Sequence, residues 1–203
     1  PDGSQLAYVK TVFAQGALQV IALAGGQPRT LVADSVFIGI SWGEDGYLYF
    51  SRTGSLLRIP VAGGEVDTLT SQEADGTVND RWPVAVPGGR GILFSRQQGT
   101  GALELLALAP GSREPRRLME GIPVAVLPSG LLLYTTDGRQ VFGVKFDLDR
   151  LEVRGTPVSL ASDLRNNGLV IADAAFSADG SMLYWSDGGS ARRVYWVDRG
   201  GLA

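Results

Sequence analysis

Short runs of apolar and aromatic residues recur along the chain, and each begins just after a glycine-containing turn. Examples are residues 6–9, 47–50 and 131–134, which are rich in side chains that favour β-strands. The turns are, in chain order, Pro1-Asp2-Gly3, Glu44-Asp45-Gly46, Pro87-Gly88-Gly89, Pro128-Ser129-Gly130 and Ala178-Asp179-Gly180. Their final glycines recur at intervals of roughly 40 to 50 residues, a repeat length typical of β-propeller blades. The pattern therefore predicts an all-β propeller with four-stranded antiparallel blades.

The repeats divide the chain into about five full or partial blades within one propeller unit that spans residues 1–203. The expected blades are 1–33 (partial), 34–71, 79–120, 121–161 and 172–203 (partial). No stretch of about eleven residues shows a 3.6-residue apolar period, so we expect essentially no helix. The first repeat lacks its innermost strand and the last lacks its outermost strand. Because these remnants do not complement each other, we expect a fragment of a larger propeller.

Composition narrows the chemistry that the chain can perform. The net charge is −3, which gives no reason to expect nucleic acid as a partner. Cysteine and histidine are both absent, which removes thiolate ligands, the commonest general base and the commonest transition-metal ligand. No run approaches the ~18 apolar residues that a membrane helix needs. We therefore expect no catalytic residue, no metal, no cofactor and no direct insertion into a membrane.

Two short motifs resemble catalytic or metal-binding patterns, but their context favours structural roles. Residues 39–43 fit the G-x-S-x-G pattern of a hydrolase nucleophile, yet the chain has no histidine to accept the proton of Ser41. Asp147 and Asp149 lack the further oxygen ligands of a calcium loop, which favours a simple turn. Three arginines on an outermost strand are interpreted as protection of a solvated sheet edge: Arg113, Arg116 and Arg117. This segment is therefore not expected to be an enzyme.

Three longer stretches carry a family resemblance. They are Arg81-Trp82-Pro83 with residues 87–90, residues 146–152 with 155–158, and residues 194–201. Together with the turns, they resemble the bacterial WD40-like, TolB-type (PD40) propeller repeats, and most closely the propeller region of receptor-like serine/threonine protein kinases. The turns at 87–89 and 128–130 lack the usual aspartate. The resemblance implies an extracytoplasmic sensor region, periplasmic or at the cell surface, attached to a cytoplasmic kinase domain.

Two connections between blades offer candidate contacts with a ligand or partner, since such loops open on one face of a propeller. The first is polar and acidic and leads into an arginine and a tryptophan: Glu73, Asp75, Asn79, Asp80, Arg81 and Trp82. The second explains the longest interval between turns: Arg165, Asn166 and Asn167. The alternatives are a solvated loop with Trp82 packed between blades, and a plain turn at the second connection.

The sequence as a whole favours a non-catalytic binding or scaffolding module. The expected partner is a protein, a peptide or a glycan held at the loop face, and nucleic acid is not expected. The resemblance makes the sensor region of a receptor-like kinase the first interpretation. Two alternatives stay open: a propeller that gates substrate entry to a separate serine peptidase domain, and a TolB-like periplasmic protein-interaction module.

Overall fold

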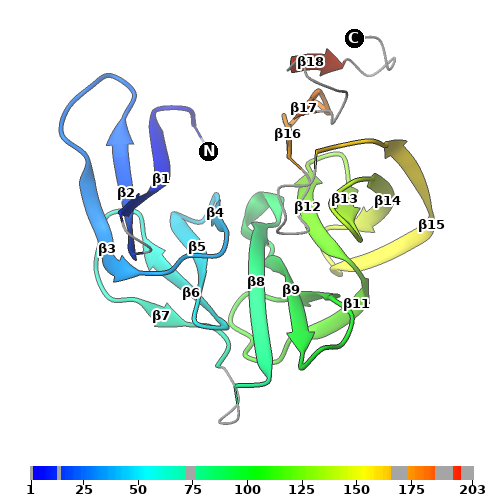
Figure 1. The fold of residues 1–203 in the computed structure, drawn as a ribbon, viewed down its shortest axis with the longest axis horizontal. Helices are drawn as coiled ribbons and strands as arrows, with labels where there is room; N and C mark the ends of the chain where they lie inside the picture. Colours follow the sequence, from blue (N-terminus) through cyan, green and yellow to red (C-terminus); the bar gives the residue numbers. More distant parts are fainter. Residues whose placement is uncertain (1, 13–14, 72–75, 166–172, 186–193, 198–203) are drawn as a thin grey trace.

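Five antiparallel β-sheets are arranged around a common axis in the computed structural model (Figure 1). The structure describes residues 2–12, 15–71, 76–165, 173–185 and 194–197. In these residues the only helical element is one short 3-10 turn, η1 (Pro87–Gly89). No helix in this part of the chain is long and apolar enough to cross a membrane. The predicted all-β propeller of antiparallel blades is confirmed.

We number the sheets as blades 1 to 5, and in each blade consecutive strands are neighbours. Blade 1 contains β1 (Gln5–Val12), β2 (Gln15–Ala22) and β3 (Arg29–Ser35). Blade 2 contains β4 (Ile40–Trp42), β5 (Tyr47–Arg52), β6 (Ser55–Pro60) and β7 (Asp67–Thr68). Blade 3 contains β8 (Val78–Ala85), β9 (Ile92–Gln98), β10 (Glu104–Leu108) and β11 (Arg116–Glu120). Blade 4 contains β12 (Ile122–Leu127), β13 (Leu131–Thr135), β14 (Val141–Asp147) and β15 (Glu152–Ala161). Blade 5 contains β16 (Ala174–Phe176), β17 (Met182–Trp185) and β18 (Val194–Val197).

The first strand of each of blades 2 to 5 lies nearest the axis, and the last strands of blades 1 to 4 lie at the periphery (Figure 1). The inner strands are β4, β8, β12 and β16, and the peripheral strands are β3, β7, β11 and β15. The connection from each blade to the next therefore returns the chain from the periphery to the axis. This arrangement brings four inner strands from four different repeats around one space.

The hydrophobic core is divided among the seams between blades. Successive residues of a strand point to opposite faces, so each middle strand contributes to two seams. In β5, Phe50 is buried against blade 1, whereas its neighbour Tyr49 is buried against blade 3. In β9, Phe94 faces blade 2 and Leu93 faces blade 4. The apolar runs of the repeat pattern are therefore continuous in blades 2 to 4, because a neighbouring blade covers each face of these sheets.

Arginines connect neighbouring blades across three of these seams. Arg29 of blade 1 donates to the carbonyl oxygen of Val61 in blade 2 at 2.5 Å. Arg113 of blade 3 forms an ion pair with Asp67 of blade 2 at 2.9 Å. Arg116 of blade 3 donates to the carbonyl oxygen of Arg150 in blade 4 at 2.7 Å. The interpretation of Arg113 and Arg116 as simple edge protection is thus wrong, because their guanidinium groups bridge two blades.

Two strands extend beyond their predicted limits. The apolar pattern alone predicts that the first strand of blade 3 starts at residue 82, whereas β8 starts at Val78. The polar residues in the first half of β8 hide this part of the strand from that pattern. The same pattern predicts the last strand of blade 4 at about residues 156–160, whereas β15 spans Glu152–Ala161. Gly155 and Pro157 lie within this longer strand, and the structure accommodates them through shifts of register against β14. Because β8 starts at Val78, the candidate residues 79–82 lie on a strand and not on a loop.

Candidate functional site

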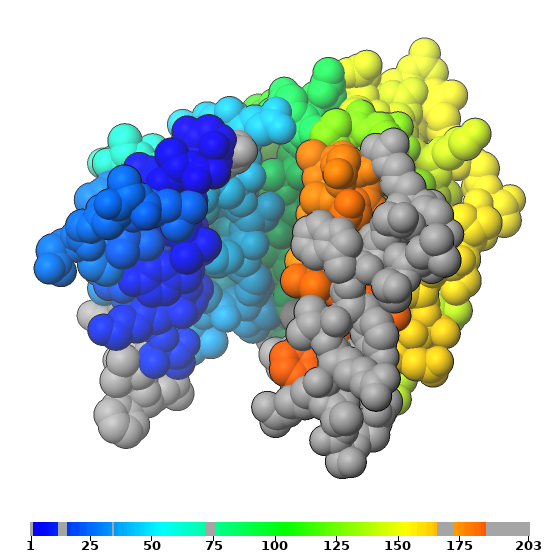
Figure 2. All heavy atoms as spheres, turned by 90° about the horizontal axis from the view of Figure 1, so that it is seen from above, coloured from blue at the N-terminus to red at the C-terminus, as the bar shows by residue number. Residues whose placement is uncertain are grey.

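The inner strands border an open hollow with a volume of about 390 Å³, which we call the central channel. Its walls come from blades 2, 3, 4 and 5: Gly39, Ile40, Ser41, Trp82, Pro83, Val84, Ala85, Pro123, Val124, Ala125, Val126 and Ala174. Figure 2 shows the molecule hollowed between the blue residues of blade 1 and the orange residues of blade 5. The wall is largely apolar, so it suits the apolar part of a ligand.

Trp82 is the strained residue of this wall. Its φ angle is +53°, in the left-handed region that a bulky side chain seldom adopts inside a strand. The pairing of β8 with β9 shifts register between Arg81 and Val84, which identifies a β-bulge. The side chain of Trp82 is only 6% exposed, and its backbone N–H donates to Ile38 at 3.2 Å. The bulge thus fixes Trp82 between the inner edges of blades 2 and 3.

Gly39 makes this close approach possible. Its φ angle is +88°, and a Cβ atom at this position would lie 2.9 Å from the Cα atom of Trp82. Two residues later, the hydroxyl oxygen of Ser41 accepts a hydrogen bond from the backbone N–H of Ala85 at 2.9 Å. Residues 39–43 therefore serve to join blade 2 to blade 3, and Ser41 has the structural contact that was expected of it.

Three buried polar side-chain atoms of the described chain have no hydrogen-bond partner in the structure: Ser51 Oγ, Arg81 Nε and Trp82 Nε1. Main-chain hydrogen bonds hold the backbones of Ser51 and Trp82 against Ile38. The backbone N–H of Ile38 donates to the carbonyl oxygen of Ser51 at 3.1 Å, and the carbonyl oxygen of Ile38 accepts from the backbone N–H of Trp82. A buried polar group without a partner costs about 1–3 kcal/mol, so such groups point to a missing acceptor or donor.

Asp80 has a different role from the one expected. It lies on β8 and is fully buried, so the placement of Asn79 and Asp80 in a loop is wrong. The Asp80 carboxylate accepts two hydrogen bonds from Arg96, at 2.7 and 2.8 Å, and one from the hydroxyl of Thr70 at 2.5 Å. These hydrogen bonds join blades 2 and 3, because Thr70 directly follows blade 2 whereas Asp80 and Arg96 both lie in blade 3. The Asp80 carboxylate is thus hydrogen-bonded within the protein and does not face a partner. Glu73 and Asp75 lie outside the described residues.

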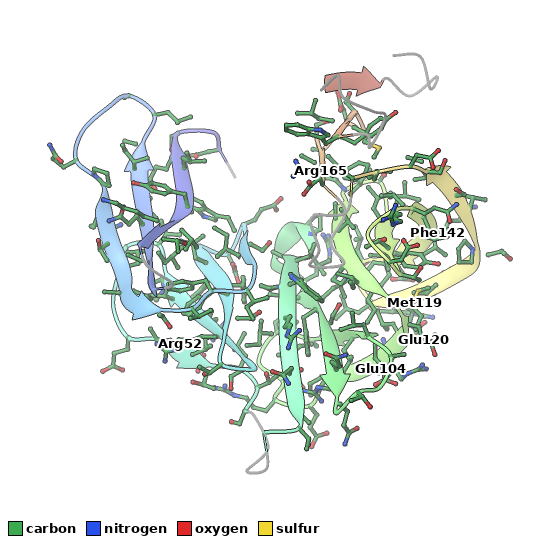
Figure 3. All side chains as sticks on the ribbon, viewed as in Figure 1. Arg52, Glu104, Met119, Glu120, Phe142 and Arg165 are labelled. Atoms are coloured by element: carbon green, nitrogen blue, oxygen red, sulfur yellow. The ribbon has the colours of Figure 1, made fainter. Side chains whose placement is uncertain are left out.

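Arg165 belongs to a different part of the molecule from Arg81 and Trp82. Its backbone N–H donates to the carbonyl oxygen of Trp185 at 2.8 Å, and its guanidinium lies 5.2 Å from the centre of the Trp185 ring. Figure 3 shows Arg165 close to the orange strands of blade 5. Asn166 and Asn167 lie outside the described residues. The structure therefore attaches Arg165 to blade 5.

A second, smaller cavity of about 90 Å³ lies at the seam of blades 2 and 3, and it was not predicted. Here the hydroxyl of Tyr49 donates to Asp45 at 2.5 Å. Burial, together with this hydrogen bond to the Asp45 carboxylate, raises the pKa of Tyr49 to about 12. The hydrogen bond from Arg113 holds the pKa of Asp67 below its ordinary value. Tyr49 and Arg113, which line this cavity, are thus bonded to Asp45 and Asp67. We therefore interpret the cavity as part of the packing between blades 2 and 3.

Asp147 and Asp149 form a turn, as expected. Asp147 accepts hydrogen bonds from the backbone N–H groups of Asp149 and Arg150, at 3.2 and 3.0 Å. Asp149 forms an ion pair with Arg90 of the neighbouring blade at 2.7 Å. Throughout the part of the chain that the structure describes, no three Asp or Glu side chains gather as metal ligands would.

No protein-family model matches this chain, and no curated protein sequence is similar to it. Solved structures are similar in shape. A regucalcin from Agrobacterium tumefaciens, described as calcium-binding, is 13% identical, with 98% of this chain and 68% of that chain covered and a TM-score of 0.66. A luciferin-regenerating enzyme is 11% identical, with 97% and 69% covered and a TM-score of 0.69. A TolB-like protein from Agrobacterium tumefaciens is 18% identical, with 87% and 64% covered and a TM-score of 0.62.

These similarities correct one expectation. A propeller of this shape is found in a protein that is described as an enzyme, the luciferin-regenerating enzyme. The conclusion that this segment is not an enzyme is therefore wrong, since neither the fold nor the absence of histidine excludes catalysis. At these levels of identity the likeness extends to the fold alone. The chain has the fold of a β-propeller, which it shares with TolB-like and regucalcin-like proteins.

Proposed function

We propose that this propeller is a binding module whose central channel receives an apolar segment of a peptide or protein partner. We further propose that it is the extracytoplasmic sensor region of a receptor-like serine/threonine kinase. The observation that carries the first proposal is the wall of the central channel. It has a volume of about 390 Å³, within the range of ordinary ligand sites, and it is mostly apolar.

The rigidity of the wall supports this role. The contacts of Ser41 with Ala85 and of Ile38 with Trp82 fix two of the inner strands against each other. A preformed site loses little conformational entropy when a ligand enters, which favours binding. The sensor role is supported by the resemblance of residues 81–83, 146–152 and 194–201 to propellers of receptor-like kinases. In such a receptor, a partner held at the axis would alter how the attached kinase domains meet.

The proposal is tested by selecting peptides from a displayed random library against the purified chain. The Ala125→Trp variant fills the central channel, and Ala102→Trp adds the same bulk on an exposed loop of blade 3. We expect the selected peptides to bind the Ala102→Trp variant like the original chain. We expect the Ala125→Trp variant to bind them about tenfold or more weakly, since the anchoring apolar groups lose their pocket. Equal binding to both variants, or no selected peptide at all, would refute the proposal.

A further inference from the structure

One edge of strand β1 in blade 1 has no neighbouring strand among the described residues. The order of strands in this blade is β1-β2-β3, so β1 pairs with β2 alone. In blades 2, 3 and 4, the corresponding strands β5, β9 and β13 each pair with an inner strand as well. Figure 1 shows β1 on the side of blade 1 that faces the axis, where such an inner strand would lie.

From this open edge we infer that the peptide partner binds as an extended strand added to β1, with an acidic side chain beside Lys10. The inference rests on the peptide binding of the proposed function and adds the conformation and the charge of the peptide to it. Strand addition to an open sheet edge is a common way for proteins to hold peptides, because the main chain supplies the hydrogen bonds.

The hydrogen bonds of blade 1 show which main-chain groups this edge offers. The register of β1 and β2 places Ser4 opposite Leu23, and the N–H of Leu23 donates to the carbonyl oxygen of Ser4 at 2.9 Å. In an antiparallel pair, residues that bond across the pair alternate with residues whose N–H and C=O groups point away. The residues of β1 that point away from β2 are therefore Gln5, Ala7, Val9 and Thr11. Their main-chain groups have no strand to bond with in the described structure, and they match an extended segment of about seven residues.

The regularity of β1 suits it to accept a strand. Its register with β2 runs from Gln5 to Val12 without a shift, and it contains neither glycine nor proline. The free outer edge of blade 4 differs, because β15 contains Gly155 and Pro157 and its register against β14 shifts twice. Natural sheets use such irregularities to block the pairing of their edges. β1 lacks them, and its one charged residue is Lys10.

One face of β1 favours apolar side chains in the partner. Ala7 and Val9 lie on the face toward blade 2, where they pack in one cluster with Phe37 and Ile40. Residues that are opposite each other in an antiparallel pair share a face. Partner side chains opposite Ala7 and Val9 would therefore meet blade 2, and apolar side chains would be buried there.

The other face of β1 favours an acidic side chain. It carries Leu6, Tyr8 and Lys10, since successive side chains point to opposite faces. Tyr8 is engaged within the blade, where its hydroxyl donates to Gln19 at 2.9 Å. Lys10 is exposed and belongs to none of the ion pairs of the described residues. Cross-strand pairs of opposite charge are favourable, so the fitting peptide alternates apolar with acidic residues.

Amide hydrogen exchange, followed for each residue by NMR, tests the inference with two synthetic peptides. One peptide alternates valine with glutamate, and the other alternates valine with lysine. We expect the amides of Ala7 and Val9 to exchange about tenfold or more slowly when the valine–glutamate peptide is bound. The amides of Leu6 and Tyr8 already bond to β2 and should change less. The valine–lysine peptide should bind more weakly, and the Lys10→Glu variant should reverse this preference.

A proline at the open edge gives an independent test. Ala7→Pro removes an outward N–H and leaves the hydrogen bonds between β1 and β2 in place. We expect it to weaken the valine–glutamate peptide about fivefold or more. Glu120→Pro is the matched control, at the free outer edge of blade 3. The N–H of Gly121 donates to Leu103, so the N–H of the neighbouring Glu120 points away from β10, and binding should be unchanged.

The outcomes separate this inference from the channel proposal. If Ala7→Pro does not fold, the exchange measurement on the unaltered chain decides alone. Unchanged exchange of Ala7 and Val9 at saturating valine–glutamate peptide, or no binding of this peptide, would overturn the added strand. Selected peptides that Ala125→Trp weakens would then still support the channel. Slow exchange before any peptide is added would also overturn the inference, since a second copy, if dilution speeds the exchange, or another part of the chain, if it does not, would already cover the edge.

Discussion

Tyr49 lies at the seam between blades 2 and 3, where its hydroxyl donates to Asp45 at 2.5 Å. The pKa of Tyr49 is raised to about 12 in the folded protein, whereas an unfolded tyrosine loses its proton near pH 10. A raised pKa contributes stability below the unfolded value and loses it as the pH rises through the folded value. Tyr49 thus contributes to stability up to about pH 10, and this contribution disappears by about pH 12.

We therefore predict that the free energy of unfolding falls between pH 10 and pH 12, by on the order of 1 kcal/mol from Tyr49. Urea unfolding at several pH values measures this change. The Tyr49→Phe variant should show a shallower decline than the original chain. The Tyr8→Phe variant, in which Tyr49 is intact, should keep the original slope. Identical slopes for the original chain and Tyr49→Phe would contradict the prediction.

At the residue scale, the sequence predicted turns well and buried polar pairs poorly. The turn aspartates Asp2, Asp45 and Asp179 each accept a hydrogen bond from the backbone N–H two residues later, which is the local bonding that makes aspartate common in turns. Asp80 looked like a loop residue because it stands in an acidic run. Its partner Arg96 is 16 positions away, and only the pairing of β8 with β9 brings the two together.

The inner strands are the elements that decide the shape of the central channel. β4 approaches β8 closely because Gly39 has no side chain. Its positive φ angle of +88° adds a second reason for glycine at this position. Gly25, in a turn of blade 1, has a similar φ angle of +101°, but a Cβ atom there would meet nothing within 4 Å. Substitutions at these two glycines therefore distinguish the cost of backbone strain, which both share, from the cost of a steric clash, which only Gly39 has.

We predict that Gly25→Ala costs about 1 kcal/mol of the free energy of unfolding, from the unfavourable backbone conformation alone. Gly39→Ala should cost about 2–4 kcal/mol, because it adds a clash with Trp82 to the same strain. Chemical denaturation of both variants measures the difference. Equal losses would show that blades 2 and 3 do not approach each other closely at Gly39.

At the element scale, the period of the turns located the middle strands of each blade, and the limits of the outer and inner strands were less accurate. β9 and β13 have apolar runs because both of their faces are buried between blades. β8 carries Asn79, Asp80 and Arg81, and β15 carries Gly155 and Pro157, so neither has the composition of a strand. Their neighbours in the sheet, not their own propensities, determine where they begin and end.

The whole molecule combines one repeated unit with a site that no single repeat contains. The even spacing of five turns was sufficient to predict blades around an axis, because each repeat buries its apolar faces against the next. The central channel is lined by residues from blades 2, 3, 4 and 5. Sequence reasoning selected Trp82 but could not join it to Gly39, about 40 residues earlier, because that contact depends on how two blades meet.

The absence of cysteine from the chain allows one direct measurement of the central claim, that a partner occupies the channel. Single cysteines are introduced at Ala125, on the channel wall, and at Ala102, on an exposed loop, and their alkylation rates are measured with and without a selected peptide. We predict that the peptide slows alkylation at position 125 by about tenfold or more and leaves position 102 unchanged. An unchanged rate at position 125 while the peptide is bound would contradict the account.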